Sequence, residues 1–319
     1  MSASVDSNKA GCAPKMPVFA PISVAFLLFN GFQPIDMTGP WQAFCTANEE
    51  LGRPFYRLET LGWTATALSA DGGLCVHVGT VIGDVALPVD MLIVPGGPGV
   101  HQLNQQAGTS AWLREMDRST QRTCSVCTGA FVLAAAGLLD GRRVTTHWRS
   151  AQQLRLSYPQ LRVNDELIYC ESGKYWTTAG VTAGIDLALA LIERDCGADV
   201  ALRVARRLVV YLRRDGDQRQ FSQMLRLQDR AAAPFRELIS QLEGSLEQDW
   251  PVDRMAERCG MSRRSFQRKF TESFGMSPVA ALSSLRLEHA QLLTRAGSLS
   301  RKAIAREVGL QELPPQEAS

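Results

Sequence analysis

The stretch Thr123–Trp148 restricts the possible folds more than any other part of this 319-residue chain. A short β-prone piece, Thr123–Val126, runs into the small residues of Cys127–Gly129, and an apolar run, Ala130–Leu139, follows directly. A strand that turns sharply into a helix places one side chain on a strained corner. We therefore predict a nucleophile elbow that carries Cys127. The alternative is a buried structural cysteine, because cysteine is among the residue types most often buried.

The same corner leads to a prediction about reactivity. At the N-terminus of a helix, unpaired N–H groups and the helix dipole favour a negative charge. This environment lowers the pKa of a cysteine thiol and makes it a better nucleophile. We therefore expect Cys127 to react with alkylating reagents before the other seven cysteines of the chain.

Apolar and helical segments alternate over the first two thirds of the chain. Ile22–Phe29 and Met91–Val94 are short apolar runs of the kind that form buried parallel strands. Further strands are expected at Tyr56–Leu61, Leu167–Cys170 and Tyr175–Thr178, with a hairpin within Ser69–Thr80. After a loop, Asn30–Gly39, helices are expected at Trp41–Leu51, Ser110–Gln121, Trp148–Leu156, Ile185–Arg194 and Asp199–Leu212. The alternation predicts a flavodoxin-like, doubly wound α/β fold with a mainly parallel sheet.

In a sheet of this type, ligands bind beyond the carboxyl ends of the strands. Asp36 lies in the predicted loop after the first strand, although a turn-forming aspartate before Gly-Pro is an alternative. The glycine-rich loop Pro95–Gly99 would bring backbone N–H groups toward a carbonyl oxygen or an oxyanion. We expect a ligand site lined by Asp36, Gly97, Cys127, Thr128 and His147. Cys127 and Asp36 are also the candidates for a catalytic role.

The positions of the four histidines exclude one reaction. A glutaminase needs a histidine base, oriented by an acid, in the later part of the domain, beyond Trp148. The histidines are at positions 77, 101, 147 and 289, and none lies between Trp148 and Glu288. Glutamine amidotransfer is therefore excluded. His147 would either line the pocket or form structural hydrogen bonds.

The eight cysteines show no framework pattern and fit a reducing cytosol better than a disulfide-bonded scaffold. Cys124 and Cys127 form a C-x-x-C pair, but no second pair and no histidines at ligand spacing accompany it. We therefore expect neither a metal nor another cofactor. No apolar run approaches the ~20 residues that span a bilayer. The expected location is the cytoplasm, without a membrane partner.

Charge is distributed unevenly along the chain. Residues 1–200 hold 14 Lys and Arg against 18 Asp and Glu, a net of −4, whereas residues 201–319 hold 20 against 14, a net of +6. A basic C-terminal part indicates a polyanionic partner, most often nucleic acid, with a solvated helix face as the alternative. We expect a disordered tail at 1–20, an α/β domain at 21–212, a polar linker at 213–233 and an all-α domain at 234–319.

The second domain contains two short helices joined by a tight turn. Val252–Arg258 precedes the turn Cys259–Met261, and Ser262 is a good N-cap for the next helix. Two such helices, the second one basic, are typical of a helix-turn-helix, whose second helix enters the major groove. Its buried stripe is predicted by three phenylalanines at four-residue spacing, Phe266, Phe270 and Phe274. DNA contacts are expected from Ser262, Arg263, Arg264, Gln267, Arg268 and Lys269.

These motifs carry a family resemblance. SVCTGAFVLAAAGLLDGRRVTTHW, residues 125–148, resembles the elbow segment of the ThiJ/PfpI superfamily, which has the class I glutamine amidotransferase-like fold. WPVDRMAERCGMSRRSFQRKF, residues 250–270, resembles the first helix-turn-helix of AraC/XylS regulators. The chain is thus most similar to the GlxA-like branch that combines both domains, from Ile22 to about Gln311. The resemblance implies that an acidic residue, Asp36 in this chain, lies beside the elbow cysteine.

The resemblance ends before the chain does. Ser284–Thr294 is similar to the long linking helix of these regulators, and Ser298–Gly309 to the opening helix of their second helix-turn-helix. After Gln311 the family continues with another recognition helix, whereas eight residues with a Pro-Pro pair follow in this chain. We therefore expect the second helix-turn-helix to be incomplete.

Two functions remain open for the α/β domain. It either senses a small-molecule effector without converting it, or acts as a cysteine-dependent hydratase resembling isonitrile hydratases. The basic helix around Arg263–Lys269 favours a DNA-binding transcriptional regulator controlled by the sensing domain, because an enzyme has no reason to keep such a helix. The alternative is a hydratase with a vestigial DNA-binding tail. We also expect a homodimer through the α/β domain, since two linked half-sites compensate for few base contacts.

Overall fold

The structure is a computed structural model that describes residues 20–69, 73–83, 89–210, 214–216, 220, 222–296 and 299–314. The chain divides into two compact units, Met1–Asp217 and Gln218–Ser319. The expected tail at 1–20 lies outside the described residues, except for residue 20, and so do residues 315–319. Among the described helices, none combines the length and the apolar character needed to cross a membrane.

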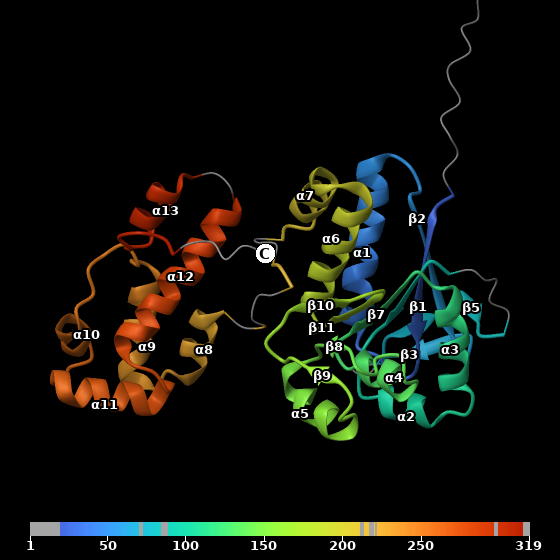
Figure 1. The fold of residues 1–319 in the computed structure, drawn as a ribbon, viewed down its shortest axis with the longest axis horizontal. Helices are drawn as coiled ribbons and strands as arrows, with labels where there is room; N and C mark the ends of the chain where they lie inside the picture. Colours follow the sequence, from blue (N-terminus) through green and yellow to red (C-terminus); the bar gives the residue numbers. More distant parts are fainter. Residues whose placement is uncertain are drawn as a thin grey trace, which may run out of the picture. The chain divides into compact units, whose positions relative to one another are not determined.

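The first unit is built on a seven-stranded sheet with the order β10-β11-β7-β6-β1-β2-β5 (Figure 1). Neighbouring strands run parallel except for β10 and β11, so the predicted doubly wound, mainly parallel fold is confirmed. The strands are β1 (Ile22–Leu28), β2 (Tyr56–Gly62), β5 (Thr80–Val81), β6 (Met91–Val94), β7 (Arg122–Val126), β10 (Tyr169–Ser172) and β11 (Tyr175–Thr178). Two small sheets are separate from it: the antiparallel hairpin of β3 (Thr66–Leu68) and β4 (Cys75–His77), and the parallel pair of β8 (Arg143–Val144) and β9 (Arg162–Val163).

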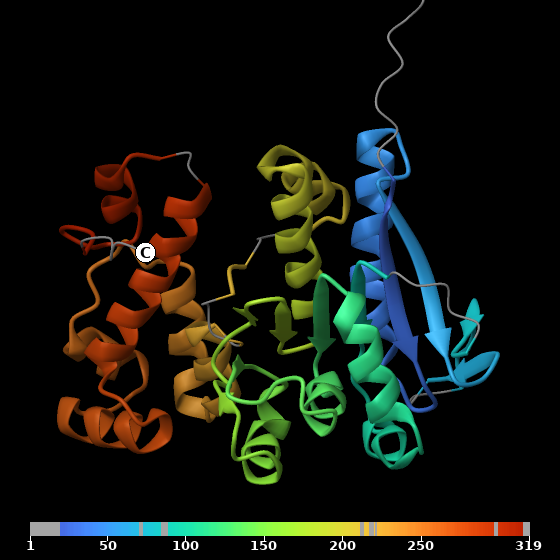
Figure 2. The ribbon, with the colours of Figure 1, turned by 45° about the vertical axis from the view of Figure 1, so that its right-hand side comes forward.

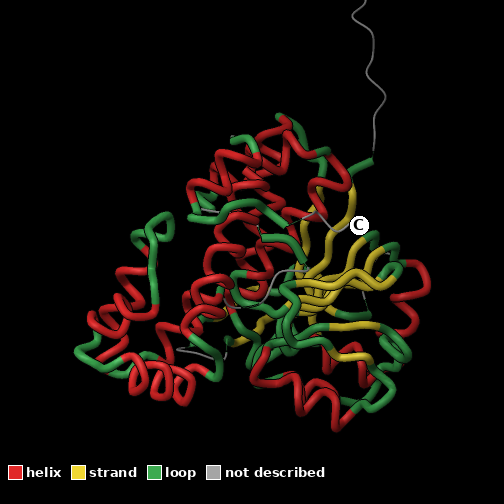
Figure 3. Tube along the Cα trace, turned by 60° about the vertical axis from the view of Figure 1, so that its left-hand side comes forward, coloured by secondary structure: helices red, strands yellow, loops and turns green. Residues whose placement is uncertain are grey.

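Helices cover both faces of the main sheet (Figures 2 and 3). One group consists of α1 (Pro34–Leu51), α6 (Ala183–Cys196) and α7 (Ala198–Arg207), which pack against one another. The other group consists of α2 (Val100–Gln105), α3 (Thr109–Ser119) and α4 (Gly129–Ala135). A further helix, α5 (Trp148–Ser157), contacts β9. Because helices lie on both sides, the central strands β1 and β6 are buried and almost entirely apolar, as expected for parallel strands.

Helix α1 begins at Pro34, seven residues before the predicted start at Trp41. Pro34 occupies the first turn, where its missing backbone N–H costs no hydrogen bond. Pro40 therefore lies inside the helix and does not start it. The loop prediction for Asn30–Gly39 is wrong over its second half, and Asp36 lies on the first turn of a helix.

Two other helix ends differ from the predictions because glycines turn the chain. The elbow helix α4 ends at Ala135, before the expected end at Leu139, and Gly137 follows with a φ of 74°. Helix α3 is preceded by Gly108, with a φ of 86°, and is not capped by Ser110. The Ser110 hydroxyl instead donates to the carbonyl oxygen of Ala135 (3.5 Å), which ties α3 to the end of α4.

The described residues of the second unit form helices joined by turns and loops, and no strand. Its helices are α8 (Gln223–Arg230), α9 (Ala233–Glu243), α10 (Val252–Arg258), α11 (Arg263–Phe274), α12 (Pro278–Ala296) and α13 (Arg301–Glu307). The predicted phenylalanine stripe of α11 is buried, and Phe235 of α9 contacts its three rings at centroid distances of 5.5–6.1 Å. Part of the stretch expected as a linker, 213–233, forms α8, whose Leu227 is buried in this core.

Candidate functional site

Cys127 lies on the sharp turn between β7 and α4, so the predicted strand–turn–helix arrangement is confirmed. Its backbone has a φ of 56°, in the left-handed region that non-glycine residues seldom adopt. Two hydrogen bonds hold this strained corner. The Cys127 N–H donates to the carbonyl oxygen of Thr178 (3.0 Å), and the Cys127 carbonyl accepts from the Thr146 hydroxyl (2.8 Å). The backbone on either side therefore fixes where the thiol emerges.

Two glycines make room for the elbow. A Cβ atom at Gly180 would lie 2.1 Å from the Cβ of Cys127, and the φ of 88° at Gly180 also favours glycine. On another side of the elbow, a Cβ atom at Gly96 would lie 2.6 Å from the backbone nitrogen of Thr128. The loops that follow β6 and β11 can approach Cys127 closely because they present no side chain at these points.

Asp36 reaches the elbow from the first turn of α1 and is fully buried. Its carboxylate accepts hydrogen bonds from the N–H groups of Gly96 (3.1 Å) and Val181 (2.7 Å), and it is hydrogen-bonded to the Cys127 thiol. The structure thus brings Asp36 and Cys127 together, in the arrangement that the family resemblance implied. One carboxylate connects α1, the loop after β6, the elbow and the segment between β11 and α6.

Burial changes the protonation of both groups. It raises the pKa of Asp36 from an ordinary value of 3.8 to about 6, although the hydrogen bonds from Val181 and Gly96 act in the opposite direction. Burial, and to a lesser extent the nearby Asp36 carboxylate, raise the pKa of Cys127 from 9.0 to about 12. The prediction of a lowered thiol pKa is therefore wrong, because the hydrogen bonds from Thr128 favour the thiolate less than lost hydration disfavours it. At neutral pH Cys127 is a thiol.

The loop Pro95–Gly99 does not present free N–H donors to a ligand, contrary to the prediction. Gly96 donates to Asp36, and Gly97 donates to the Thr128 hydroxyl (2.8 Å). Gly99 donates to the carbonyl oxygen of Gly31 (3.2 Å), and prolines have no N–H. The loop instead fastens α1 and the elbow to each other, and Gly97 and Thr128 belong to this internal network.

His147 forms a structural hydrogen bond, which is one of the two roles predicted for it; the other was to line the pocket. It is the N-cap residue of α5, and its Nδ1 accepts from the N–H of Arg149 at 3.4 Å. Burial and the neighbouring Arg149 lower the pKa of His147, which favours the neutral ring that this acceptor role needs. The adjacent Thr146 binds the Cys127 carbonyl, so His147 lies one residue from the elbow network.

Sequence reasoning missed a cavity of about 100 Å³ beyond the carboxyl ends of β1 and β2. Strand β1 has β2 on one side and β6 on the other, so the cavity lies near the point where the strand order reverses, which is where doubly wound folds bind ligands. The indole N–H of Trp63 is buried, and no described residue accepts a hydrogen bond from it. The cavity is lined by Leu28, Phe29, Asn30, Trp63, Thr64, Gly99, Gln102, Leu103 and Gln106.

Arg214 was also not identified from the sequence. It lies close to the end of the first unit and binds α6 and the residue before it. Its guanidinium donates to Asp186 (2.6 and 3.0 Å) and to the Thr182 hydroxyl (2.9 Å), and its backbone N–H donates to Asp186 (3.1 Å). Thr182 follows directly on Val181, whose N–H binds Asp36. Hydrogen bonds, together with the peptide link between Val181 and Thr182, therefore connect the elbow to Arg214.

On the second unit, the candidate DNA-contacting residues lie along α11. Ser262 caps this helix as predicted, since its hydroxyl accepts from the N–H of Ser265. Two of the basic residues are engaged within the unit: Arg263 pairs with Asp253 (2.8 Å), and Arg268 pairs with Glu272 (3.3 Å). The other two basic residues, Arg264 and Lys269, are exposed and make no ion pair with another described residue, and the Gln267 side chain is exposed as well.

Comparison with known proteins agrees with this two-part organisation. Residues 22–194 match the DJ-1/PfpI family, and residues 255–314 match a helix-turn-helix domain. The HTH-type transcriptional regulator CdhR of Pseudomonas aeruginosa is 34% identical over 284 residues, which cover 86% of this chain and 81% of CdhR. The chain therefore belongs to the DJ-1/PfpI family, within the group of transcriptional regulators that also carry a helix-turn-helix domain.

Two further relatives resemble the chain less completely. The isonitrile hydratase of Pseudomonas putida is 33% identical over 180 residues, which cover 56% of this chain and 75% of that enzyme. A crystal structure of a THiJ/PfpI family protein from Pseudomonas syringae has a TM-score of 0.55 at 22% identity and covers 80% of this chain and 98% of that one. The latter likeness supports the fold.

Proposed function

We propose that this protein is a transcriptional regulator that binds DNA through α11 and senses a small molecule in its first unit. The observation that carries the proposal is α11 itself, which buries its phenylalanine stripe and leaves Arg264, Gln267 and Lys269 exposed. A helix of this kind fits the major groove. DNA is then the partner of the second unit, and the cytoplasm is the compartment in which a regulator of this class works.

The three exposed side chains take different parts in DNA binding. Arginine reads guanine and glutamine reads adenine through paired hydrogen bonds to base edges. We assign these roles to Arg264 and Gln267. Lysine acts as a point charge toward phosphate, which we assign to Lys269. Arg263 and Arg268 hold ion pairs within the unit, so we expect them to contribute less.

A competition binding assay between a promoter duplex and a random duplex, at two salt concentrations, tests this assignment. Arg264→Ala should reduce the preference for the promoter, because each bidentate base contact contributes about 1–3 kcal/mol of discrimination. Lys269→Ala should weaken binding to both duplexes alike and reduce the salt dependence of the affinity. Arg118→Ala, an exposed arginine of α3 in the first unit, is the matched control. Equal effects of the three substitutions would contradict the role of α11.

The sensing part of the proposal rests on the hydrogen bonds around Asp36. A small molecule that separates Asp36 from Cys127 would also disturb Val181, whose φ of 55° is strained for a β-branched residue. Val181 precedes Thr182, which binds Arg214. Effector binding would in this way change the position of the last residues of the first unit. The cavity lined by Trp63 is a candidate for the pocket in which the effector binds.

A hydratase activity at Cys127 is the second candidate function, because the first unit is similar to isonitrile hydratase. Two observations favour binding over turnover. The raised pKa leaves Cys127 protonated, and the N–H groups nearest the elbow are already bonded within the protein. Incubating the full chain with an isonitrile and following formamide formation decides between the two. Turnover that is lost in Cys127→Ser would establish the enzyme.

A further inference from the structure

The small sheet formed by β8 and β9 places two arginines opposite each other. Arg143 pairs in register with Arg162, and Val144 pairs with Val163. Paired residues on neighbouring strands point to the same face, and like charges directly opposite each other are destabilising. Both arginines are exposed, and neither makes an ion pair with a described residue. Two arginines at paired strand positions, without a carboxylate partner, can each offer N–H donors to an anion.

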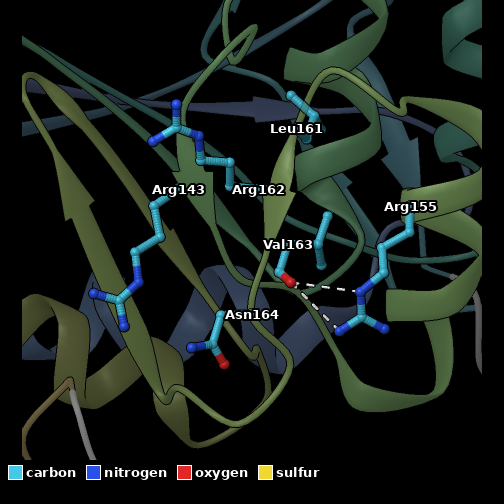
Figure 4. A pocket seen from close by; sticks show the side chains of 6 residues that line it. All are labelled: Arg143, Arg155, Leu161, Arg162, Val163 and Asn164. Carbon is cyan, nitrogen blue, oxygen red and sulfur yellow. Dashed lines mark hydrogen bonds between the residues drawn. The ribbon is translucent and has the colours of Figure 1, made fainter.

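These arginines border an open hollow of about 510 Å³ on the first unit. Figure 4 shows Arg143 and Arg162 on one side of the hollow, Arg155 of α5 on the other and Asn164 between them. The apolar side chains of Leu161 and Val163 also line it. Three arginines from three separate elements therefore surround one space, together with an amide that can donate or accept a hydrogen bond.

Arg155 differs from the other two because it is held in place. Its guanidinium pairs with Asp165 (2.6 Å) and donates to the carbonyl oxygen of Val163 (3.4 Å). Asp165 neutralises only this one of the three charges. The planar guanidinium group presents its N–H donors in a fork that matches a carboxylate or a phosphate, so the charge that is left over suits an oxyanion.

We propose that this hollow binds a small oxyanion with at least two negative charges, a phosphate-bearing or dicarboxylate metabolite. A second site of this kind is distinct from the elbow, because neither Cys127 nor Asp36 lines it. DNA is the less suitable occupant. Residues 1–200 carry a net charge of −4, which repels an extended polyanion, whereas a small anion responds to the arginines within about one Debye length, ~8 Å.

Calorimetric titration of the full chain with pyrophosphate and with succinate tests the proposal. We expect saturable binding of one molecule per chain to at least one of these probes. Arg143→Gln and Arg162→Gln should each weaken that binding at least about tenfold, and Arg143→Lys, which keeps the charge but loses the fork, should weaken it less. Arg206→Gln, an exposed arginine of α7, removes the same charge elsewhere and should leave binding within about twofold.

Thermal unfolding gives a second, independent readout. Without an added anion, Arg143→Gln should unfold at a higher temperature than the parent chain, because one of two opposed charges is gone. With the bound probe the order should reverse, since the variant loses the stabilisation that the anion supplies. Absence of saturable binding by both probes, or equal weakening in Arg206→Gln, would overturn the proposal. So would a loss of DNA affinity in Arg143→Gln as large as that in Lys269→Ala, because it would make the hollow a DNA contact.

Discussion

The buried carboxylate of Asp36 should make the stability of the first unit depend on pH. Its pKa is about 6 in the folded chain and 3.8 for an unperturbed side chain, a difference of about two pH units. At about 1.4 kcal/mol per unit, the ionised form costs about 3 kcal/mol more in the folded than in the unfolded state. Between pH 4 and pH 6 the folded chain binds more protons than the unfolded chain. The free energy of unfolding should therefore fall as the pH rises through this window and level off above it.

Asp36→Asn isolates this contribution because the amide does not titrate. From pH 4 to pH 7, the free energy of unfolding of the parent chain should fall by about 2–2.5 kcal/mol relative to that of Asp36→Asn. Urea denaturation followed by tryptophan fluorescence reports mainly on the first unit, which contains five of the six tryptophans. Asp140→Asn, which removes an exposed carboxylate of the same unit, is the control. A difference between the parent chain and Asp36→Asn that stays constant from pH 4 to pH 8 would contradict a raised pKa for Asp36.

Three further predictions concern the elbow and the assembly. Gly180→Ala should lower the free energy of unfolding by about 2–4 kcal/mol, since its Cβ would lie 2.1 Å from Cys127, whereas Gly141→Ala, with a similar φ of 71° and open space, should cost about 1 kcal/mol. Equal losses in urea melts would argue against a close contact at Gly180. Iodoacetamide near neutral pH should label the exposed Cys75 before Cys127, because only a thiolate reacts; peptide mass mapping that finds Cys127 labelled first would contradict the raised pKa. Sedimentation of the full chain at micromolar concentration should show a dimer, and a monomer would contradict the homodimer expected from the sequence.

Local patterns predicted the elements whose boundaries depend on nearby residues. The apolar run Met91–Val94 and the helix Val252–Arg258 have the expected bounds, because short-range hydrophobic patterning and turn residues determine them. The start of α1 was predicted at the wrong residue because Pro40 has the features of a first-turn proline. In the structure the helix begins at Pro34, and Pro40 lies inside it. The local sequence thus indicated Pro40, and not Pro34, as the first-turn proline of the helix.

The chemistry of the candidate site depended on long-range contacts that no local pattern contains. The sequence placed Cys127 on the correct corner, but the direction of its pKa shift follows from burial and from Asp36, which the fold brings in from α1. The same holds for the donors of Pro95–Gly99, which are bonded to residues of α1 and the elbow. The opposition of Arg143 and Arg162 requires the register of β8 and β9, two strands of two residues each that show no strand pattern.

We propose that the Asp36–Cys127 pair alters DNA binding through Arg214, whose guanidinium binds Thr182 and Asp186 of the first unit. The most direct test is a double-mutant cycle in which promoter affinity is measured for the parent chain, Asp36→Asn, Arg214→Ala and the double variant. We predict that Asp36→Asn changes promoter affinity by about 5-fold or more, the lower end of common allosteric couplings, and that the change disappears when Arg214 is replaced. An unaltered affinity in Asp36→Asn, or the same change in the presence and absence of Arg214, would contradict a coupling between Asp36 and DNA binding through Arg214.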